Sequence, residues 1–319
     1  MLGKYDIVVS TKKVTYKLEV KRNITIIQGD SATGKSTLID LISQYNRLGA
    51  SSGVSVVCEK ECIAVLGLDW QSDIRNSSER IFFLDENNSF IYTKEFAQIV
   101  SGSDNYFVII ARDSLPQLAY SIDEIYGMRE DRKSQKYIEA RHIYNEIYNL
   151  YNSTYSEDRF APELVITEDS NSGYDFFSEI YKNMCISANG KSNISILSRK
   201  KEFADKKILI IVDGAAFGAD INELLRSTLD REVYVYAPES FEYLVLLSKI
   251  VTVNQEMLEH TYDYADSKYY LSWERFYTEI LKNNSSGTIY QYTKRNLNKT
   301  YLTQGNIKKI KENMPKAIL

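Results

Sequence analysis

The fold of the first part of the chain is decided by the stretch Ile24-Thr25-Ile26-Ile27-Gln28-Gly29-Asp30-Ser31-Ala32-Thr33-Gly34-Lys35-Ser36-Thr37-Leu38-Ile39. Its first four residues are β-branched, which predicts a short buried strand, and apolar residues recur at helical spacing from Thr37 onward. Between these two elements, Gly29–Ser36 matches the pattern G-x-x-x-x-G-K-[ST] of a phosphate-binding loop. The strand before the loop and the helix after it are the context that this pattern requires. We therefore expect an α/β domain with a nucleotide site at this loop.

Each residue type in the loop has a chemical role. The glycines let the backbone curl so that successive N–H groups face a phosphate, and the helix N-terminus adds a partial positive charge. Lys35 is expected to bridge the β- and γ-phosphates, and the Ser36 hydroxyl is expected to bind Mg²⁺. The predicted cofactors are therefore ATP and Mg²⁺, and the alternative is a glycine-rich turn that binds nothing. The expected nucleotide-binding residues are Gly29, Asp30, Ser31, Ala32, Thr33, Gly34, Lys35, Ser36 and Thr37.

The composition is that of a globular protein with two domains. The chain has 319 residues, of which 44% are hydrophobic and 26% are charged, and domains typically contain about 100–200 residues. No apolar run approaches the roughly 18 residues needed to cross a bilayer, and Met1–Asp6 does not begin a signal peptide. We expect a cytoplasmic protein with no membrane partner.

Cysteines and histidines limit the metal chemistry that is available. Cys58, Cys62 and Cys185 are odd in number, and the first two have no second pair to complete a zinc site. We expect all three to be reduced thiols. His142 and His260 are the only histidines, so a multi-histidine metal centre is excluded. Any metal should be held by carboxylates and phosphates, which suits Mg²⁺.

The charge distribution gives two alternatives for the end of the chain. The net charge of −4 provides no general attraction for nucleic acid. The tail is locally basic, however, with tyrosines interleaved, and such a pattern can bind a phosphate backbone and stack bases. Nucleic acid is therefore a candidate partner, and a solvated C-terminal face is the alternative. The basic residues are Lys282, Lys294, Arg295, Lys299, Lys308, Lys309, Lys311 and Lys316, and the tyrosines are Tyr290, Tyr292 and Tyr301.

Two further motifs accompany the phosphate loop. Tyr5–Val20 reads as two alternating strands that lead directly into the loop's strand, and Arg80–Glu86 is an apolar run that ends in two acids. A hairpin so close before the loop resembles the start of ABC-type ATPase domains. This resemblance implies that Asp85 holds Mg²⁺ through water and that Glu86 polarises the attacking water. The alternative is a buried strand that ends at two solvated acids.

The resemblance to ABC-type ATPases extends to the next strand and then departs from the family pattern. Thr93 is expected to cap a short helix, and Asn105–Ala111 is a buried strand followed by Arg112 and Asp113. The resemblance implies that one of these two residues senses the γ-phosphate, and a plain strand end is the alternative. About fifty residues separate the two nucleotide motifs, which leaves no room for the family's long helical insertion, and no L-S-G-G-Q signature is present. Because ABC-like sites are usually completed by a neighbour, we expect a homo-oligomer or a complex with a partner protein.

The expected domain limits follow from these segments. Residues 1–131 form the ATPase domain, and residues 132–160 form a connecting helix and linker, because apolar residues recur at helical spacing there up to about Asn152. Residues 161–260 form a second, smaller α/β domain, and residues 261–319 form a helical, basic tail with helices around Trp273–Leu281 and Gly305–Asn313.

The second domain is predicted to contain a parallel sheet, because strands and helices alternate in it. The expected strands are Glu163–Thr167, Ile194–Leu197, Ile208–Val212 and Val233–Tyr236. Acids follow three of them, namely Glu168, Asp213 and Glu239. In parallel sheets, functional groups gather at the carboxyl ends of the strands.

This order of acids resembles the Toprim domain of topoisomerases, primases and OLD-family nucleases. The resemblance implies that Glu168 acts in acid–base chemistry and that Asp213 binds Mg²⁺ for phosphodiester cleavage. The family's D-x-D reads Asp213-Gly214-Ala215 here, so its second acid is absent unless Asp220 or Glu239 substitutes. A phosphate-loop ATPase followed by a Toprim-like unit also resembles the OLD-type anti-phage proteins.

Three hypotheses of function follow. The first is an ATP-controlled, Mg²⁺-dependent nuclease with Glu86, Glu168 and Asp213 as catalytic residues and Ser36, Asp85, Asp213 and Glu239 as metal-binding residues. The second is an ATP-dependent switch or assembly module whose Toprim-like domain recognises a partner without catalysis. The third is a kinase, which the phosphate loop alone would allow but for which no acceptor site stands out.

Overall fold

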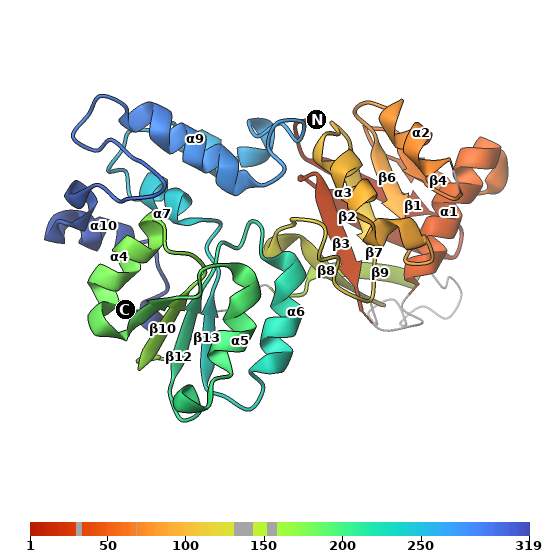
Figure 1. Ribbon diagram of the computed structural model, residues 1–319. Helices are drawn as coiled ribbons and strands as arrows, with labels where there is room; N and C mark the ends of the chain where they lie inside the picture. The colour runs from red at the N-terminus through yellow and green to blue at the C-terminus, as the bar shows by residue number, and fades with distance from the viewer. Residues whose placement is uncertain (30–33, 68, 131–142, 152–157) are drawn as a thin grey trace. The chain divides into compact units, whose positions relative to one another are not determined.

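The computed structural model describes residues 1–29, 34–67, 69–130, 143–151 and 158–319. The contacts within the chain divide it into two units: the first contains Met1–Asn152 and Tyr262–Leu271, and the second contains Ser153–Thr261 and Ser272–Leu319. Both units are mixed α/β structures with parallel strands in their sheets, as the sequence predicts (Figure 1).

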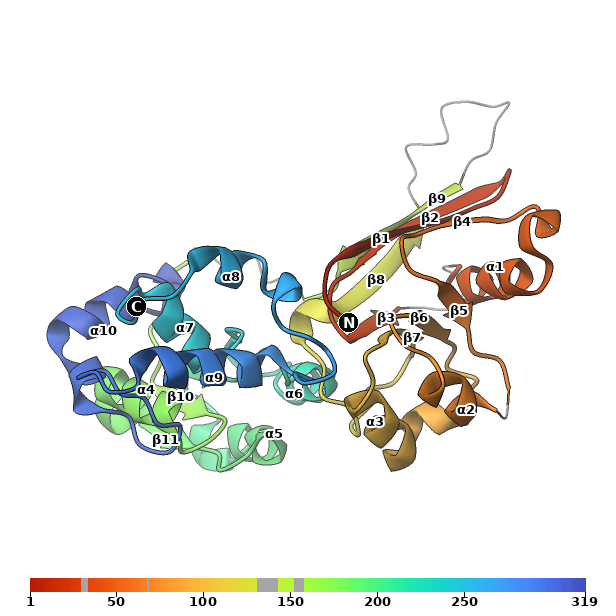
Figure 2. The same cartoon turned by 90° about the horizontal axis from the view of Figure 1, so that it is seen from above.

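The described residues of the first unit form a nine-stranded sheet of order β4-β1-β2-β9-β8-β3-β7-β6-β5. Strands β8, β3, β7, β6 and β5 pair with one another in parallel. The β1–β2 hairpin and β4 extend the sheet with antiparallel pairs (Figure 2). The strands are β1 (Tyr5–Ser10), β2 (Val14–Val20), β3 (Ile24–Gln28), β4 (Ser55–Val57), β5 (Cys62–Ala64), β6 (Ile81–Leu84), β7 (Tyr106–Ile110), β8 (Ile125–Glu130) and β9 (Ile143–Asn149).

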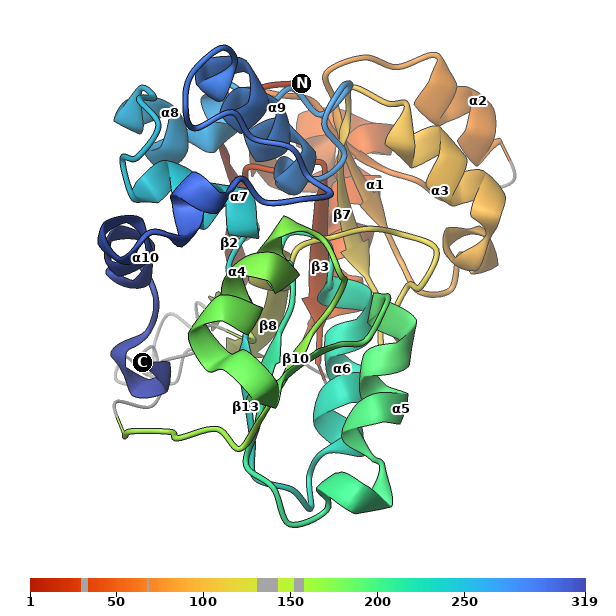
Figure 3. The ribbon, with the colours of Figure 1, turned by 60° about the vertical axis from the view of Figure 1, so that its left-hand side comes forward.

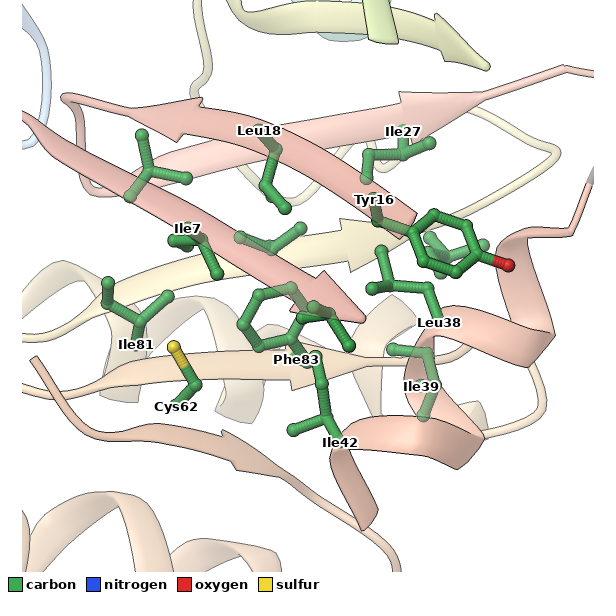
Figure 4. Close-up of a cluster of buried hydrophobic side chains, with 14 of the residues drawn as sticks. Ile7, Tyr16, Leu18, Ile27, Leu38, Ile39, Ile42, Cys62, Ile81 and Phe83 are labelled. Carbon is green, nitrogen blue, oxygen red and sulfur yellow. The ribbon is translucent and has the colours of Figure 1, made fainter. Parts of the chain in front are cut away.

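Helix α1 (Lys35–Leu48) lies against one face of this sheet. Its Leu38 and Ile42 side chains point toward Ile27 and Phe83 of the parallel strands and toward Ile7 of the hairpin (Figure 4). All of these side chains are buried. The side chains of a strand alternate between the two faces of its sheet, so one set of strand residues packs on α1 and the next set packs on the opposite face.

The opposite face carries an aromatic cluster and two helices, α2 (Trp70–Arg75) and α3 (Lys94–Ser101). The ring of Trp70 stacks on that of Phe90 with their centroids 4.4 Å apart, and Phe96 meets Phe107 of β7 edge to face. The Thr93 hydroxyl accepts a hydrogen bond from the Phe96 N–H, which confirms the predicted cap.

The helix expected over residues 132–152 is wrong wherever the structure describes that segment. Ile143–Asn149 is strand β9, which pairs antiparallel with β8 and parallel with β2. The segment therefore completes the first sheet. Residues 131–142, including His142, lie outside the described residues.

The second unit has a four-stranded, fully parallel sheet of order β11-β10-β12-β13. Figure 3 shows α5 and α6 together on one side of this sheet, with α4 and α7 on the other. The strands are β10 (Leu164–Thr167), β11 (Cys185–Ser187), β12 (Ile208–Ile211) and β13 (Val233–Tyr236). The helices are α4 (Ser172–Tyr181), α5 (Ile194–Ser198), α6 (Gly218–Ser227), α7 (Phe241–Leu247), α8 (Gln255–Glu259), α9 (Trp273–Ser285) and α10 (Gln304–Lys311).

One predicted strand of this unit is wrong. Ile194–Leu197 lies in helix α5, and the second strand along the chain is Cys185–Ser187, which pairs with β10. The two predicted tail helices are confirmed as α9 and α10. None of the helices in the described part of the chain combines the length and the apolar character that crossing a membrane would require.

Candidate functional site

The segment that matches the phosphate-binding pattern joins β3 to α1, and the glycines at its two described ends have positive φ. Gly29 has φ 133° and Gly34 has φ 88°, values that favour glycine, and α1 begins at Lys35. The Lys35 ammonium group donates a hydrogen bond of 2.7 Å to the Gly29 carbonyl, so the lysine side chain reaches back to the residue that follows β3. The Tyr16 hydroxyl donates a hydrogen bond of 3.0 Å to the Gly34 carbonyl. The predicted binding residues Asp30, Ser31, Ala32 and Thr33 lie outside the described residues.

The first turn of α1 is suited to an anion. Its N-cap is Gly34, which has no side chain to occupy the N–H groups of that turn, and the turn contains no acid. The side chains of Ser36 and Thr37 are exposed there. Helix N-termini of this kind attract phosphate through their N–H groups and their dipole.

The predicted second motif, Arg80–Glu86, ends at the carboxyl end of β6, which lies one strand away from β3 in the sheet. Strand β7 separates β3 from β6 and runs parallel to both, with Ile27 opposite Ile110 and Leu84 opposite Ile109. The carboxyl ends of the three strands therefore lie at one edge. Asp85 is buried, and its Oδ1 accepts hydrogen bonds from the backbone and side-chain nitrogens of Asn87 at 2.9 and 2.5 Å.

Two residues with separately predicted roles meet at this edge. The Arg112 Nε lies 2.8 Å from Glu86 Oε1, and the glutamate side chain is 20% exposed. The predicted water-polarising acid and a predicted γ-phosphate sensor thus form an ion pair. An arginine that can turn from a carboxylate to a phosphate suits a site whose charge changes with nucleotide.

In the second unit, Glu168 and Asp213 lie at the point where the strand order reverses. Glu168 follows β10, and Asp213 follows the neighbouring strand β12, while β11 and β13 lie on opposite sides of this pair. In open parallel sheets, ligands bind outside the strand ends at such a reversal. The Asp213 N–H donates a hydrogen bond of 3.2 Å to Glu168 Oε2, so the structure brings these two predicted residues together.

Glu239, the third predicted acid, lies in the segment after β13 that is hydrogen-bonded to the residues following Asp213. Its carbonyl accepts a hydrogen bond from the Ala215 N–H at 3.2 Å, and the Pro238 carbonyl accepts one from the Gly214 N–H at 2.7 Å. Glu239 is not among the residues that line the hollow over Glu168 and Asp213, whereas Glu242 is. Glu242 is 2% exposed and lies in the first turn of α7, which Ser240 caps.

The hollow is small and strongly acidic. Its space is about 30 Å³, which suits an ion or a water molecule. Burial, together with the charges of Glu274 and Asp169, raises the pKa of Glu168 to about 7, against a hydrogen bond from Asp213 that lowers it. Burial also raises the pKa of Asp213, and the carboxylates of Glu274, Glu242 and Glu168 raise it further.

Two residues from the C-terminal segment complete the hollow. The Tyr292 hydroxyl donates a hydrogen bond of 2.8 Å to Glu242 Oε1, and the Lys294 ammonium group is paired with Glu274. Burial alone would lower the pKa of Lys294, but the charges of Glu274 and Glu242 raise it above its usual value. Lys294 therefore stays protonated and offsets part of the negative charge. Its backbone is fixed as well, because the Lys294 carbonyl accepts hydrogen bonds from the N–H and hydroxyl of Ser172.

The basic tail consequently differs from the predicted nucleic-acid surface in three residues. Lys294 faces carboxylates, and Tyr292 and Tyr301 are 3% and 0% exposed. These two tyrosine rings cannot stack on bases while they are buried. Glu242, Glu274 and Lys294 are site residues that no sequence motif predicted. The one local signal was the Ser240 cap, which begins a helix with an acid in its first turn.

A metal at either site would depend on few protein ligands. Within the described ranges, no three Asp, Glu, Cys or His side chains are grouped so that they could hold a metal ion. Glu168 and Asp213 still fit Mg²⁺, which is commonly held by one or two carboxylates together with water and phosphate oxygens. Ser36 and Asp85 carry oxygen atoms of the kind that Mg²⁺ prefers.

Comparisons of the chain with protein-family models, with curated proteins and with solved structures found no match in any of the three.

Proposed function

We propose that the first unit binds ATP with Mg²⁺ at Gly29–Thr37. The support is the position of Lys35, whose ammonium group is held 2.7 Å from the Gly29 carbonyl, and the first turn of α1, which no side chain caps. In this proposal, Lys35 binds the β- and γ-phosphates and Ser36 contacts Mg²⁺. Asp85 orders the water shell of the metal, and Glu86 polarises the attacking water once Arg112 has turned to the γ-phosphate.

The ATP site is tested by calorimetric titration of the folded Lys35→Ala variant. Loss of the ammonium group removes a charge-assisted contact to phosphate, so the affinity should fall by roughly 100-fold. Glu86→Gln is the matched variant, because it should keep ATP bound and slow hydrolysis by about 100-fold or more. Unchanged ATP affinity in Lys35→Ala would show that the loop is not the site.

We infer that the second unit carries a metal-dependent nuclease site controlled by the nucleotide state of the first. The observation that carries this inference is the hydrogen-bonded pair of Glu168 and Asp213 at the strand-order reversal. Bound Mg²⁺ would supply charge stabilisation for a phosphodiester under attack. Glu168, with its pKa near 7, is suited to accept and return a proton at neutral pH. Asp213 would hold the metal, and Glu242 is better placed than Glu239 to contribute a further carboxylate.

A second function is favoured by a specific observation, the half-buried Lys294 in the hollow. Its ammonium group already lies among the acids of the hollow, where a metal would otherwise supply positive charge. A domain neutralised in this way would recognise a partner without cleavage, and the protein would then be an ATP-dependent switch or assembly module.

Nuclease assays of the complete assembly distinguish the two functions. Single- and double-stranded DNA and RNA are incubated with Mg²⁺ or Mn²⁺, with and without ATP, using wild type and Asp213→Asn. The nuclease proposal expects cleavage by the wild type that depends on nucleotide and metal, and loss of cleavage with intact ATP binding in Asp213→Asn. Wild-type inactivity under all conditions would leave the switch.

A further inference from the structure

In the first unit, Cys58 directly follows β4, and Cys62 is the first residue of β5. Three residues separate them, and both side chains pack against the core cluster around α1. The Lys60 N–H donates a hydrogen bond of 3.5 Å to the Cys58 sulfur, and the Cys62 thiol donates one of 3.7 Å to the Lys60 carbonyl. Both sulfur atoms therefore contact the main chain of one residue, on the inner side of the bend.

The two thiols differ in acidity: the pKa of Cys58 is lowered, as in a nucleophilic cysteine, and the pKa of Cys62 is raised. The neighbouring Cys62 side chain lowers the pKa of Cys58 to about 7, against burial, and the backbone N–H groups of Lys60 and Glu59 lower it further. Interaction with Cys58, together with burial, raises the pKa of Cys62. Cys58 is thus the thiolate near neutral pH, and Cys62 keeps its proton.

The pair can also be reached from solvent. An open hollow of about 450 Å³ is lined by both cysteines and by Asn46, Gly49 and Lys60. Cys58 is half-buried, whereas Cys62 is only 4% exposed. A small oxidant would therefore meet Cys58 first.

We propose that Cys58 and Cys62 form a reversible dithiol–disulfide couple, with Cys58 as the residue attacked by a hydroperoxide and Cys62 as the resolving thiol. The Cys58 thiolate attacks one oxygen of hydrogen peroxide, the O–O bond breaks, and a sulfenic acid and hydroxide form. The Cys62 thiol then gives its proton to this hydroxide, which becomes water. The Cys62 sulfur attacks the Cys58 sulfur, so that the S–S bond forms and the S–O bond breaks. The second hydroxide, which leaves from Cys58, takes a proton from solvent and becomes water. Overall, two thiols lose two electrons to one peroxide, and two water molecules leave.

The bond would be regulatory rather than structural. A disulfide that closes so short a loop removes little entropy from the unfolded chain, so reduction by a thiol is easy. The couple is also linked to α1, because the Asn46 side chain donates to the Cys62 carbonyl at 2.8 Å and accepts from the Ala64 N–H at 2.9 Å. The proposal concerns these thiols alone and does not depend on ATP or nuclease activity.

Peptide mass spectrometry tests the couple in the full-length wild type. The reduced protein is treated with one equivalent of hydrogen peroxide, blocked with N-ethylmaleimide, unfolded and cut with trypsin. Because trypsin cuts after Lys60, the disulfide should appear as two tryptic peptides joined through Cys58 and Cys62, and dithiothreitol should separate them. Cys185 is the internal control, since burial raises its pKa to about 12 and its thiol should stay reduced.

Two folded variants assign the roles. In Cys62→Ser the Cys58 sulfenic acid should accumulate and react with dimedone, while Cys58→Ser should give at least tenfold less dimedone adduct at Cys62, because little of that thiol is ionised. Equal labelling of the two cysteines, oxidation of Cys58 to sulfinic acid without a joined peptide, or oxidation of Cys185 at the same rate would each overturn the proposal.

Discussion

The carboxyl group of Glu168 is held in a place where its negative charge is costly. It lies beside Asp213 in the acidic hollow, and burial raises its pKa to about 7. An acid whose pKa is higher in the folded state than in the unfolded chain binds its proton more tightly when folded. Its contribution to stability is fully present below about pH 4.5 and is lost as the pH rises through 7.

Glu168→Gln is therefore expected to flatten part of the pH dependence of stability. Between pH 5 and pH 8 the wild type should lose roughly 2–3 kcal/mol of unfolding free energy that the glutamine variant keeps, since one pKa unit corresponds to about 1.4 kcal/mol. Urea unfolding at several pH values measures the effect. Glu179→Gln, at an exposed position of α4, is the control and should follow the wild type. Parallel curves for wild type and Glu168→Gln would contradict the raised pKa.

At the scale of elements, the turn after β12 depends on a close backbone approach. A Cβ on Gly214 would lie 2.7 Å from the Ala237 carbonyl oxygen and 2.9 Å from that of Pro238. These are main-chain atoms, and Gly214 itself donates a hydrogen bond to Pro238. The absence of a side chain at Gly214 thus lets the segment that follows β12 pack directly against the segment that follows β13.

Gly214→Ala should destabilise the second unit by about 1–3 kcal/mol, because the strand ends must separate to admit the methyl group. The matched control is Gly305→Ala in α10, where a Cβ meets nothing within 4 Å. Alanine there should be neutral or should stabilise by up to about 1 kcal/mol. Urea unfolding compares the two, and equal midpoints for Gly214→Ala and wild type would show that the turn relaxes freely.

Local sequence patterns predicted most strands of both sheets, assigned the wrong element at two places, and did not predict β4, β5, β8 and β11. The strands at residues 24–28 and 208–211 are short runs rich in isoleucine and bounded by turn signals, so their patterns are unambiguous. Residues 143–149 have apolar positions at helical spacing, but the segment lies between β2 and β8. Strand pairing on both of its edges outweighs the helical spacing. Ile194–Leu197 is too short for its apolar run to separate strand from helix.

The residues of the candidate sites also divide into those that local patterns predicted and those that they did not. Gly29, Lys35, Asp85, Glu168 and Asp213 stand directly after strands or at a loop pattern, so the sequence could place them at sheet edges. Glu274 and Lys294 reach the hollow from α9 and the segment after it, far along the chain from Asp213. Such contacts are products of tertiary packing, and no local pattern carries them.

At the scale of the whole molecule, the first unit is not one continuous piece of chain. Tyr262–Leu271 belongs to it, although the residues on both sides of this segment belong to the second unit. The segment is fixed by a hydrogen bond of 2.7 Å from the Gly3 N–H to the Tyr262 carbonyl and by one of 3.1 Å from the Asn23 side chain to the Leu271 carbonyl. Ala265 and Ser267 are buried within it.

A fragment of residues 1–152 should consequently be less stable than the same fragment joined to residues 262–271 by a flexible Gly/Ser linker. The expected difference is roughly 1–3 kcal/mol, the scale of two or three lost hydrogen bonds with their buried neighbours. Circular dichroism during urea unfolding measures it, with a scrambled 262–271 sequence on the same linker as control. If the native and scrambled fusions unfold together, the segment contributes nothing to the first unit.

The divided first unit also sets an order of events during translation. A ribosome adds about 5–20 residues per second, and about 120 residues lie between Asn152 and Leu271. The nascent chain would therefore carry a first sheet without its last segment for roughly 6–24 seconds, while most of the second unit is still being made. Codon choice between these two points would then change how long that unfinished intermediate is exposed to chaperones and proteases.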